Sequence, residues 1–529
     1  MKKENAAQRV ERIKKEKSGL DVLEDIKRYA KSNEPLDPED IDRFKWYGLY
    51  TQNKNSQDES DENLYFMLRV KLEKGAMNLE QMKVVSEISE KYAKETATLT
   101  TRQDIQFHNI SVQNLPTIFE KLQKVGLSTV FAAGDVPRNV VTCPVSGIEH
   151  EEVIDVNHIS SSINDYFRGN KELANLPRKY KVGISACSKH CMGHEIQDLS
   201  FTAVKIEDEI LFDVSVGGGL ASNKQIATHL GYVKEENILE VVKTVSYIYR
   251  DYGLRESRKK ARLGHLIDQL GIEEFKALVE SKIGFSFYNK SIQEYTPYSK
   301  REHFGVHKSK KEGYSYIGCA INGGKLGAKG LASLASSLEK YQATTIRATN
   351  TQNFIITDVP NQNVDLLVNE LKNQQIDANP SSFKARTISC TGIEFCKFAI
   401  VETKNQAIEL AKYLEKQFPD FDETVSISVN GCPNSCAHPH VVDIGLLGTK
   451  FKDTNGDTVS GFEVILGGNL EGDKSSFGEK TKLKIKDTQV NEVVEKLILE
   501  YQNSDINVFN QFVKEKVSDQ NFIAKLVES

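Results

Sequence analysis

The sequence predicts an α+β fold that arose by internal duplication, with mixed and antiparallel sheets covered by helices. Strand-like and helix-like segments alternate along the chain, which is typical of layered α+β domains. In addition, four short motifs recur in the same order about 250 residues apart. A chain of 529 residues is long enough for three or four domains.

The repeated motifs define two related halves that share a pseudo-twofold relationship. The matched pairs are Thr100–Gln103 with Thr349–Gln352, Arg138–Cys143 with Arg386–Cys390, Cys187–Cys191 with Cys432–Cys436, and Phe212–Leu220 with Phe462–Leu470. The second half keeps a set of four cysteines, whereas the first lacks a counterpart of Cys396 and carries cations such as Arg102, which aligns with Thr351. We expect one half to hold a metal centre and the other to hold anions, with a large ligand between them.

Taken in order, the patterns divide the chain into five segments: 1–45, 46–130, 131–290, 291–380 and 381–529. The first is a charged arm with short helical pieces. Expected strands lie at 64–72, 99–110, 179–186, 197–205 and 209–216, and expected helices at 78–92, from 115, and at 158–173, 223–230, 237–252 and 270–282. From Tyr314 onward a comparable order of elements recurs.

Composition excludes several classes of protein. A net charge of −5 on 69 basic and 74 acidic residues gives no reason to expect nucleic acid as a partner. The charged start has no apolar core of the kind a secretory signal needs, and no apolar run approaches the roughly 20 residues that span a bilayer. We therefore expect a cytoplasmic protein, without membrane contact, whose cysteines stay reduced.

The four cysteines of the second half are candidate metal ligands. Five residues separate Cys390 from Cys396, and three separate Cys432 from Cys436. Reduced thiolates suit zinc or iron–sulfur clusters. Structural zinc sites favour gaps of about two to four residues within each pair, so the longer gap fits zinc less well. Spacing alone leaves an iron–sulfur cluster, zinc and unligated thiols as alternatives.

These two cysteine pairs and the duplicated halves together resemble the sirohaem-containing assimilatory sulfite and nitrite reductases. The resemblance extends from Arg43 to about Leu470. It implies a three-domain architecture in which 46–130 and 291–380 are ferredoxin-like half-domains, 131–290 is a sirohaem-site domain, and 381–529 binds the cluster and sirohaem. It further implies that the four cysteines hold a [4Fe–4S] cluster and that Cys436 also bridges to the sirohaem iron.

The resemblance also implies roles for residues of the first half. The segments Phe66–Leu72, Asp135–Val140 and Leu176–Lys181 look like the family's anion-binding segments, so Arg69, Arg138, Lys179 and Lys181 are expected around the substrate. Lys179 and Lys181 would point the same way because side chains repeat every two residues on a strand. The segment Thr101–His108 resembles the strand that lines sirohaem, which implies Arg102, Gln106 and His108 as cofactor-binding residues.

The implied activity is the six-electron reduction of sulfite to sulfide. Lys179 and Lys181 are like the sulfite-reducing members, whereas nitrite reductases typically have Asn at the second position. The segment His194–Asp198 looks more like the nitrite reductases, so reduction of nitrite to ammonia is the alternative. The chain has no nucleotide-binding glycine motif, so we expect ferredoxin as the electron donor, and a monomer. The non-enzyme alternative is a zinc-stabilised binding protein.

The remaining cysteines and one basic segment have simpler interpretations. We interpret Cys187 and Cys191 as relics of the duplication, with a second metal site as the alternative, and Cys143 and Cys319 as packed thiols. Arg255–Arg262 is expected to be a charged helix face, with a role in donor docking or sirohaem binding as the alternative.

Overall fold

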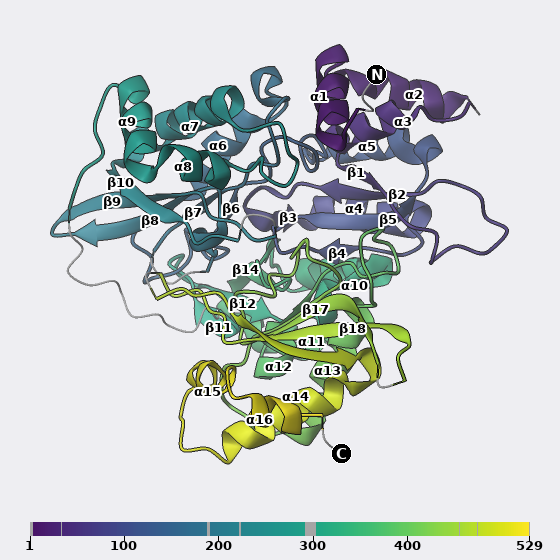
Figure 1. Ribbon diagram of the computed structural model, residues 1–529, viewed down its shortest axis with the longest axis vertical. Coiled ribbons are helices and arrows are strands. Elements are labelled where there is room, and N and C mark those ends of the chain that lie inside the picture. The colour runs from purple at the N-terminus through teal and green to yellow at the C-terminus, as the bar shows by residue number, and fades with distance from the viewer. Residues whose placement is uncertain are drawn as a thin grey trace.

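The computed structural model describes residues 4–32, 34–187, 191–221, 224–290, 303–453, 455–472 and 474–527. The predicted α+β class with internal duplication is confirmed, because four sheets fall into two corresponding pairs. In Figure 1 the first half lies in the upper part of the view, in purple to teal, and the second half lies below it, in green to yellow.

Two sheets form the ferredoxin-like part of the molecule. The strand order of the first sheet is β1 (Leu49–Thr51), β2 (Phe66–Val70), β5 (Ile105–Ile110) and β4 (Thr98–Leu99). The strand order of the second sheet is β11 (Gly305–Lys308), β12 (Tyr314–Cys319), β14 (Phe354–Pro360), β13 (Thr345–Ala348) and β3 (Ala76–Asn78). Helices α4 (Leu79–Tyr92), α5 (Leu115–Lys124), α10 (Gly327–Lys340) and α11 (Val364–Asn373) accompany them. Strand β3 comes from the first half but pairs with β13 of the second. One hydrophobic core therefore contains residues of both halves, from Val22 to Val136 and from Ile317 to Ala378.

Two buried glutamines join the halves in a reciprocal arrangement. Gln103 Nε2 donates to the carbonyl of Ala348 at 2.9 Å, and Gln352 Nε2 donates to the carbonyl of Leu99 at 3.2 Å. Both residues have a positive φ, 54° and 65°. Because the same residue makes the same cross-contact in each repeat, the pseudo-twofold relationship inferred from the sequence is present in the packing.

The other two sheets share one topology. The strand order of the first is β10 (Thr228–Val233), β9 (Glu209–Val216), β8 (Leu199–Ile206), β7 (Val182–Ser185) and β6 (Val141–Thr142). The strand order of the second is β19 (Glu479–Lys486), β18 (Thr458–Leu466), β17 (Ile444–Lys452), β16 (Ile427–Asn430) and β15 (Thr387–Ser389). In each sheet the last three strands, β6 to β8 and β15 to β17, run parallel and the other pairs are antiparallel. Parallel neighbours bring the loops at their carboxyl ends to one edge of the sheet.

Helices cover both of these sheets and build separate hydrophobic cores. The first sheet is accompanied by α6 (Asn157–Phe167), α7 (Ile238–Tyr252), α8 (Leu263–Leu270) and α9 (Ile272–Ile283). The second is accompanied by α12 (Ser382–Arg386), α13 (Lys404–Gln417), α14 (Val490–Gln502), α15 (Phe509–Lys516) and α16 (Gln520–Lys525). In Figure 1 helices α6 to α9 lie along one face of the first sheet, and α14 to α16 lie beyond the second.

The amino-terminal arm consists of α1 (Ala6–Glu16), α2 (Leu23–Lys31) and α3 (Pro38–Arg43). Buried Lys14 Nζ donates to the carbonyl of Leu176 at 2.9 Å, and Trp46 Nε1 donates to the carbonyl of Ala174 at 2.8 Å. The arm therefore packs against the segment that precedes Lys179 and Lys181.

Three expectations about secondary structure were wrong in detail. The single strand expected at 99–110 is two strands, β4 and β5, separated by a tight turn in which Gln103 has a positive φ. No helix forms at 224–230: residues 224–227 are irregular apart from one bridge, and residues 228–230 begin strand β10, which pairs with β9 at the edge of the sheet; residue 223 lies outside the described residues. Helix α6 ends at Phe167 because Gly169 adopts a left-handed conformation, with φ 61°.

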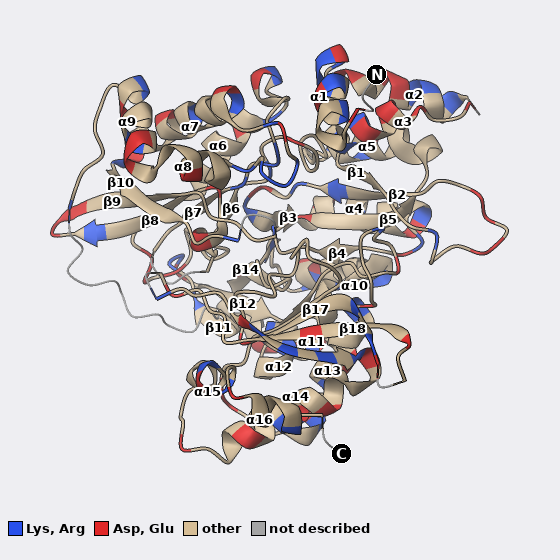
Figure 2. Ribbon diagram, viewed as in Figure 1, with Lys and Arg blue, Asp and Glu red and all other residues tan. Residues whose placement is uncertain are grey.

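Charge and hydropathy agree with the composition. Figure 2 shows basic and acidic residues interspersed over the helices and loops. No helix among the described residues is long and apolar enough to cross a bilayer. All eight cysteines are free thiols.

Candidate active site between the two halves

The four predicted cysteines lie together at one edge of the second five-stranded sheet. Cys390 directly follows β15 and Cys432 follows β16 after one residue, and these strands are parallel neighbours. The amide of Gly431 donates to Cys390 Sγ at 3.1 Å, which joins the two loops. Cys390, Cys396 and Cys432 each interact electrostatically with Cys436. The fold thus brings all four thiols to one place.

The spacing of these thiols suits a cluster better than a single ion. Thiolates bound to one tetrahedral zinc at about 2.3 Å lie about 3.8 Å apart. In the part of the chain that the structure describes, no three of these four thiols lie within 4.8 Å of one another. Burial raises the pKa of Cys390 to about 11 although the Gly431 amide lowers it, so a strongly cationic group is needed to hold the thiolate form.

The Cys432–Cys436 loop is held by a buried asparagine. Asn430 Nδ2 donates to the carbonyl of Cys432 at 2.5 Å, and Asn430 Oδ1 accepts from the amide of Ala437 at 2.9 Å. Cys436 is the most exposed of the four cysteines, and Thr101 Oγ1 of the first half donates to its carbonyl at 3.1 Å. Cys436 therefore lies on the side of the thiol set that faces the first half.

Two arginines of the first half converge on one carbonyl. Arg69 Nη1 and Arg138 Nη1 both donate to the oxygen of Ala132, at 3.3 and 3.2 Å. The Nε atom of each is buried and makes no hydrogen bond within the described chain. Two like charges held this close, each with an unused donor, form an attractive site for an anion.

Lys179 and Lys181 complete this cationic group and connect it to the thiols. Burial lowers the pKa of Lys179 to about 8, with Arg262 and Arg138 adding repulsion and Cys436 opposing it. Burial and the neighbouring Lys179 lower the pKa of Lys181 further. Neither ammonium group forms an ion pair with a carboxylate of the described residues. Lys179 is the cation that interacts electrostatically with Cys436, and Arg138 and Lys181 in turn interact with Lys179.

Buried ion pairs hold the segments that carry these cations. Asp135 accepts from Arg258 Nη1 and Nη2 at 2.6 and 2.8 Å, and Asp198 accepts from Arg262 Nε and Nη2 at 3.0 and 2.7 Å. Asp198 also accepts from the amide of Lys181 at 2.8 Å. The expectation of a charged helix face at 255–262 was wrong, because this segment is a loop between α7 and α8 whose arginines point into ion pairs.

The three predicted cofactor residues of the first half occupy different places. Arg102 lies in the turn between β4 and β5 and donates to Gln197 Oε1 at 3.0 Å, while its Nε has no partner in the described chain. Gln106 accepts from Arg69 Nη2 at 3.5 Å and donates to Thr391 Oγ1 at 3.1 Å, so it connects the cations to the cysteine loop.

His108 lies against the cysteine loop instead of among the cations. Its ring stacks on Phe395, beside Cys396, with centroids 4.0 Å apart and planes 9° from parallel. Burial lowers the pKa of His108 to about 3, so the imidazole is neutral. It borders a cavity of about 270 Å³ that Gln106, Thr391 and Lys404 also line.

Two further groups belong to the cationic site but were missed in the sequence. Tyr50 Oη accepts from Arg138 Nη2 at 3.3 Å, and Arg69 Cζ lies 6.0 Å from the centroid of its ring. Burial raises the pKa of Tyr50, but the charges of Arg138 and Arg69 outweigh it and bring the pKa to about 7. Burial raises the pKa of Asp104 to about 6 despite Arg69 and the neighbouring cations. Neither residue carries a recognisable motif; only the position of Asp104 inside Thr101–His108 could have signalled it.

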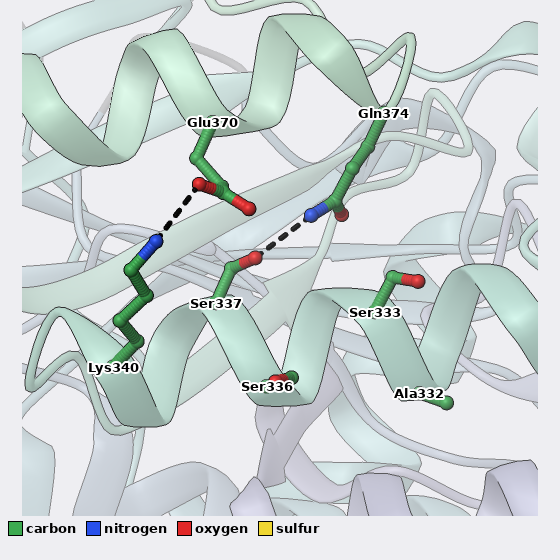
Figure 3. A pocket seen from close by; sticks show the side chains of 7 residues that line it. All are labelled: Ala332, Ser333, Ser336, Ser337, Lys340, Glu370 and Gln374. Atoms are coloured by element: carbon green, nitrogen blue, oxygen red, sulfur yellow. Dashed lines mark hydrogen bonds and ion pairs between the residues drawn. The ribbon is translucent and has the colours of Figure 1, made fainter.

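A second pocket lies between α10 and α11 in the ferredoxin-like part of the molecule, and it is lined by polar side chains. Figure 3 shows its lining side chains on α10 and α11. Lys340 pairs with Glu370 at 3.1 Å, and Gln374 donates to Ser337 at 2.7 Å. This pocket is lined by serines, an amide and a lysine–glutamate ion pair, and contains no cysteine or histidine, so the site between the halves remains the candidate.

Comparisons with known proteins agree with this geometry. Residues 133–287 and 382–510 match the family described as the nitrite and sulphite reductase 4Fe-4S domain, and residues 58–125 and 307–374 match the nitrite/sulfite reductase ferredoxin-like half domain. A sulfite reductase (ferredoxin) 1 of Mycolicibacterium paratuberculosis is 35% identical over 93% of this chain and 91% of that protein. A ferredoxin–nitrite reductase of Synechococcus elongatus is 31% identical over 93% and 96%. The solved Mycobacterium tuberculosis NirA protein superposes with a TM-score of 0.89 at 32% identity, over 98% of this chain and 97% of that chain.

Proposed function

This chain belongs to the nitrite and sulfite reductase family, and on that premise we propose that it reduces sulfite to sulfide with electrons from ferredoxin. It is an oxidoreductase whose cofactors are a [4Fe–4S] cluster and sirohaem. The single observation that carries the proposal is a group of four cations, without carboxylate partners for the lysines among the described residues, that interacts through Lys179 with the most exposed of the four thiols.

We assign the cofactor contacts to particular residues. Cys390, Cys396, Cys432 and Cys436 would hold the cluster, and Cys436 would also bridge to the sirohaem iron. Arg102, with its unused Nε, and Gln106 would face the sirohaem. His108 would act on the cluster side, because it packs on Phe395. When bound, the two cofactors supply electrons and an iron ion that binds the substrate.

The residues of this chain would bind the oxyanion and supply protons. Arg69 and Arg138 hold a small oxyanion by charge-assisted hydrogen bonds, since arginine offers a planar fork of donors. Each oxygen that leaves the substrate as water needs protons. Lys179, whose pKa is lowered to about 8, can donate one from the Nζ atom more readily than an ordinary lysine. Lys181 beside it is a second proton donor.

The choice of sulfite depends on Lys181. A second ammonium group at this position favours the more highly charged anion, whereas the nitrite reductases that the motif resembles typically have asparagine there. Relatives named for each activity match this chain over similar lengths. Nitrite reduction on the same site therefore stays as the second candidate function.

The zinc-stabilised binding protein is not favoured, because among the described residues no three of the four thiols lie within 4.8 Å of one another. The domain boundaries, the monomeric state and the cytoplasmic location remain predictions. Ferredoxin as donor is supported by the names of the relatives.

Steady-state kinetics test the proposal. We expect the purified protein, supplied with reduced ferredoxin or reduced methyl viologen, to have a higher kcat/KM for sulfite than for nitrite. A kcat/KM for nitrite far above that for sulfite would contradict the sulfite assignment and favour nitrite reduction. A protein with no visible absorption after anaerobic reconstitution with iron, sulfide and sirohaem would refute the reductase assignment altogether.

A further inference from the structure

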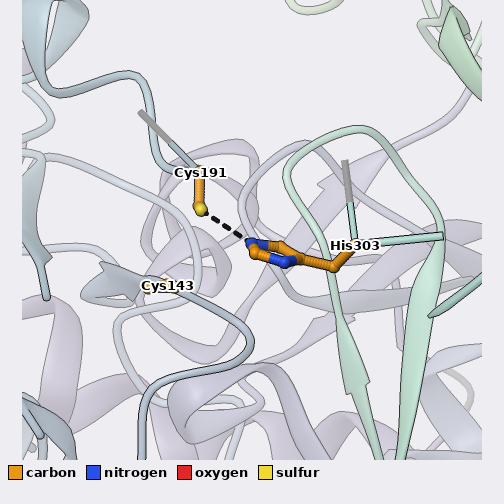
Figure 4. Close-up of side chains that lie close together, drawn as sticks. All are labelled: Cys143, Cys191 and His303. Carbon is orange, nitrogen blue, oxygen red and sulfur yellow. Dashed lines mark hydrogen bonds between the residues drawn. The ribbon is translucent and has the colours of Figure 1, made fainter. Parts of the chain in front are cut away.

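A second group of metal-ligating side chains lies in the first half, apart from the four-cysteine set. Cys143, Cys191 and His303 come from three distant segments, and their donor atoms all lie within 4.8 Å of one another. Figure 4 shows the His303 ring directed at Cys191, with Nε2 and Sγ 3.1 Å apart. Cys143 is buried, and the side chain of His303 is only 11% exposed. Among the described residues no other group of three Cys, His, Asp or Glu donors is this compact.

The two cysteines occupy the positions of two cluster cysteines in the duplicated fold. Cys143 directly follows edge strand β6, as Cys390 follows β15. Cys191 lies in the connection between β7 and β8, as Cys436 lies in the connection between β16 and β17. The interpretation of Cys143 as an isolated packed thiol is therefore incomplete, because the fold places it with Cys191 for the same reason that it brings Cys390 near Cys436.

His303 supplies a third donor that the second half does not use. It precedes strand β11 and so comes from the linker into the second ferredoxin-like half-domain. Its Nδ1 lies 3.6 Å from the carboxylate of Glu149, which also accepts a hydrogen bond from the hydroxyl of buried Tyr316. A carboxylate on the Nδ1 side favours the tautomer with the proton on that nitrogen, in which Nε2 has a lone pair toward Cys191.

We propose that Cys143, Cys191 and His303 bind one Zn²⁺ ion, with a water molecule as the fourth ligand. Two thiolates and one imidazole are donors that zinc prefers, and tetrahedral ligation at about 2.0 to 2.3 Å requires donor atoms about 3.5 to 3.8 Å apart. The three donor atoms lie within 4.8 Å of one another, and Cys191 Sγ and His303 Nε2 are 3.1 Å apart, so shifts of less than about 1 Å would give this spacing. An iron–sulfur cluster is disfavoured because it needs more donors, set farther apart.

A zinc ion at this site would stabilise the fold by joining three segments. It would tie the end of β6, the loop after β7 and the strand β11 that enters the second ferredoxin-like sheet. Zinc bound to the native state stabilises that state by mass action. Removing it is expected to lower the melting temperature without removing iron.

Zinc analysis of the full-length holoenzyme tests the proposal. After loading with Zn²⁺ and desalting, we expect about one zinc per chain by mass spectrometry. Cys143→Ser, Cys191→Ser and His303→Gln should each lose that zinc and keep the iron content and visible spectrum. Cys319→Ser, which removes a buried thiol elsewhere, is the matched control and should retain both.

Three results would overturn the proposal. They are a wild-type protein that retains no zinc after loading, zinc retained equally by His303→Gln, and a Cys143–Cys191 disulfide found by peptide mapping of the zinc-loaded protein. His303→Gln keeps the test valid if a cysteine variant fails to fold, because it exchanges one polar side chain for another, whereas Cys143 belongs to a hydrophobic core. The metal readout is independent of sulfite reduction, so failure here leaves the proposed function unaffected.

Discussion

The sheets β6–β10 and β15–β19 have one topology but different chemistry at corresponding points. In the first, the amide of Lys181 donates to buried Asp198, which Arg262 neutralises. In the second, the amide of Ser426 donates to buried Asp443 at 2.7 Å, and Asn510 donates to the same carboxylate at 2.6 Å. In both sheets a backbone amide donates to a buried aspartate. The side chain that also pairs with this aspartate is the charged Arg262 in the first sheet and the neutral Asn510 in the second. The duplicated scaffold thus fixes where the loops go, and the side chains decide what each half binds.

The cysteine loops show the same division. Cys432 and Cys436 belong to a set of four thiols of which no three described atoms lie within 4.8 Å of one another, whereas the corresponding loop of the first half contributes Cys191 to a more compact group with Cys143 and His303. The cations Lys179 and Lys181 come just before that loop. On the proposed assignments, the second half would carry the electron-transferring metal and the first half would carry the charge that binds the substrate.

The largest expected effect comes from exchanging one cysteine for serine in each half. Cys432→Ser should remove cluster iron and lower sulfite reduction by about 10³-fold or more, because a cluster ligand is lost. Cys187→Ser, at the corresponding place in the first half, should keep iron content and activity within about 2-fold. Iron analysis and a methyl viologen assay measure both. Equal iron loss in the two variants would break the comparison.

The next effect concerns the cations. Lys181→Ala should lower kcat/KM for sulfite by about 10²- to 10³-fold, as expected for removing a charged group from a buried anion site. Its counterpart Ser426→Ala should change kcat/KM by less than about 3-fold, because Ser426 only supports Asp443. Lys181→Asn should shift the ratio of kcat/KM values toward nitrite by about 10-fold or more. An unchanged ratio would mean that another residue sets the substrate preference.

A smaller effect should appear in the pH profile. Above its pKa of about 7, Tyr50 becomes an anion that neutralises Arg138 and Arg69, so binding of an oxyanion weakens. Above its pKa of about 8, Lys179 loses the proton that it would donate. The kcat/KM for sulfite should therefore fall as pH rises from 7 to 9.

Replacing the phenol separates these two contributions. Tyr50→Phe should remove the decline near pH 7 and leave the decline near pH 8, and we expect a gain of a few fold at pH 8 relative to wild type. The comparison needs full kcat/KM profiles for both proteins at constant ionic strength. Superimposable profiles would show that Tyr50 does not titrate in the substrate site.

The smallest expected effect tests the symmetry itself. Gln103→Ala and Gln352→Ala each remove a buried hydrogen bond across the pseudo-twofold axis, so each should cost about 1–3 kcal/mol in the free energy of unfolding. Urea denaturation of both variants measures this loss. A large loss for one glutamine and none for the other would show that the two contacts are not equivalent.

Much of this arrangement could be predicted because it depends on short-range patterns. The cysteine spacing and the repeats led to the four thiols, and the motif around Leu176–Lys181 led to the lysines. Tyr50 could not be found in this way, since it reaches Arg138 only through tertiary packing. His303 and Cys143 are separated by most of a domain, so their meeting depends on the fold. Strand β10 was mistaken for a helix because its pairing with β9 overrides local preference.

An anomalous difference map at the iron absorption edge, from crystals of the purified protein, tests the central claim most directly. The account predicts iron bound by Cys390, Cys396, Cys432 and Cys436, further iron between Cys436 and the group of Lys179 and Lys181, and none at Cys143 and Cys191. Iron at the first-half cysteines, or its absence from the second-half set, would contradict the division of chemistry between the two halves.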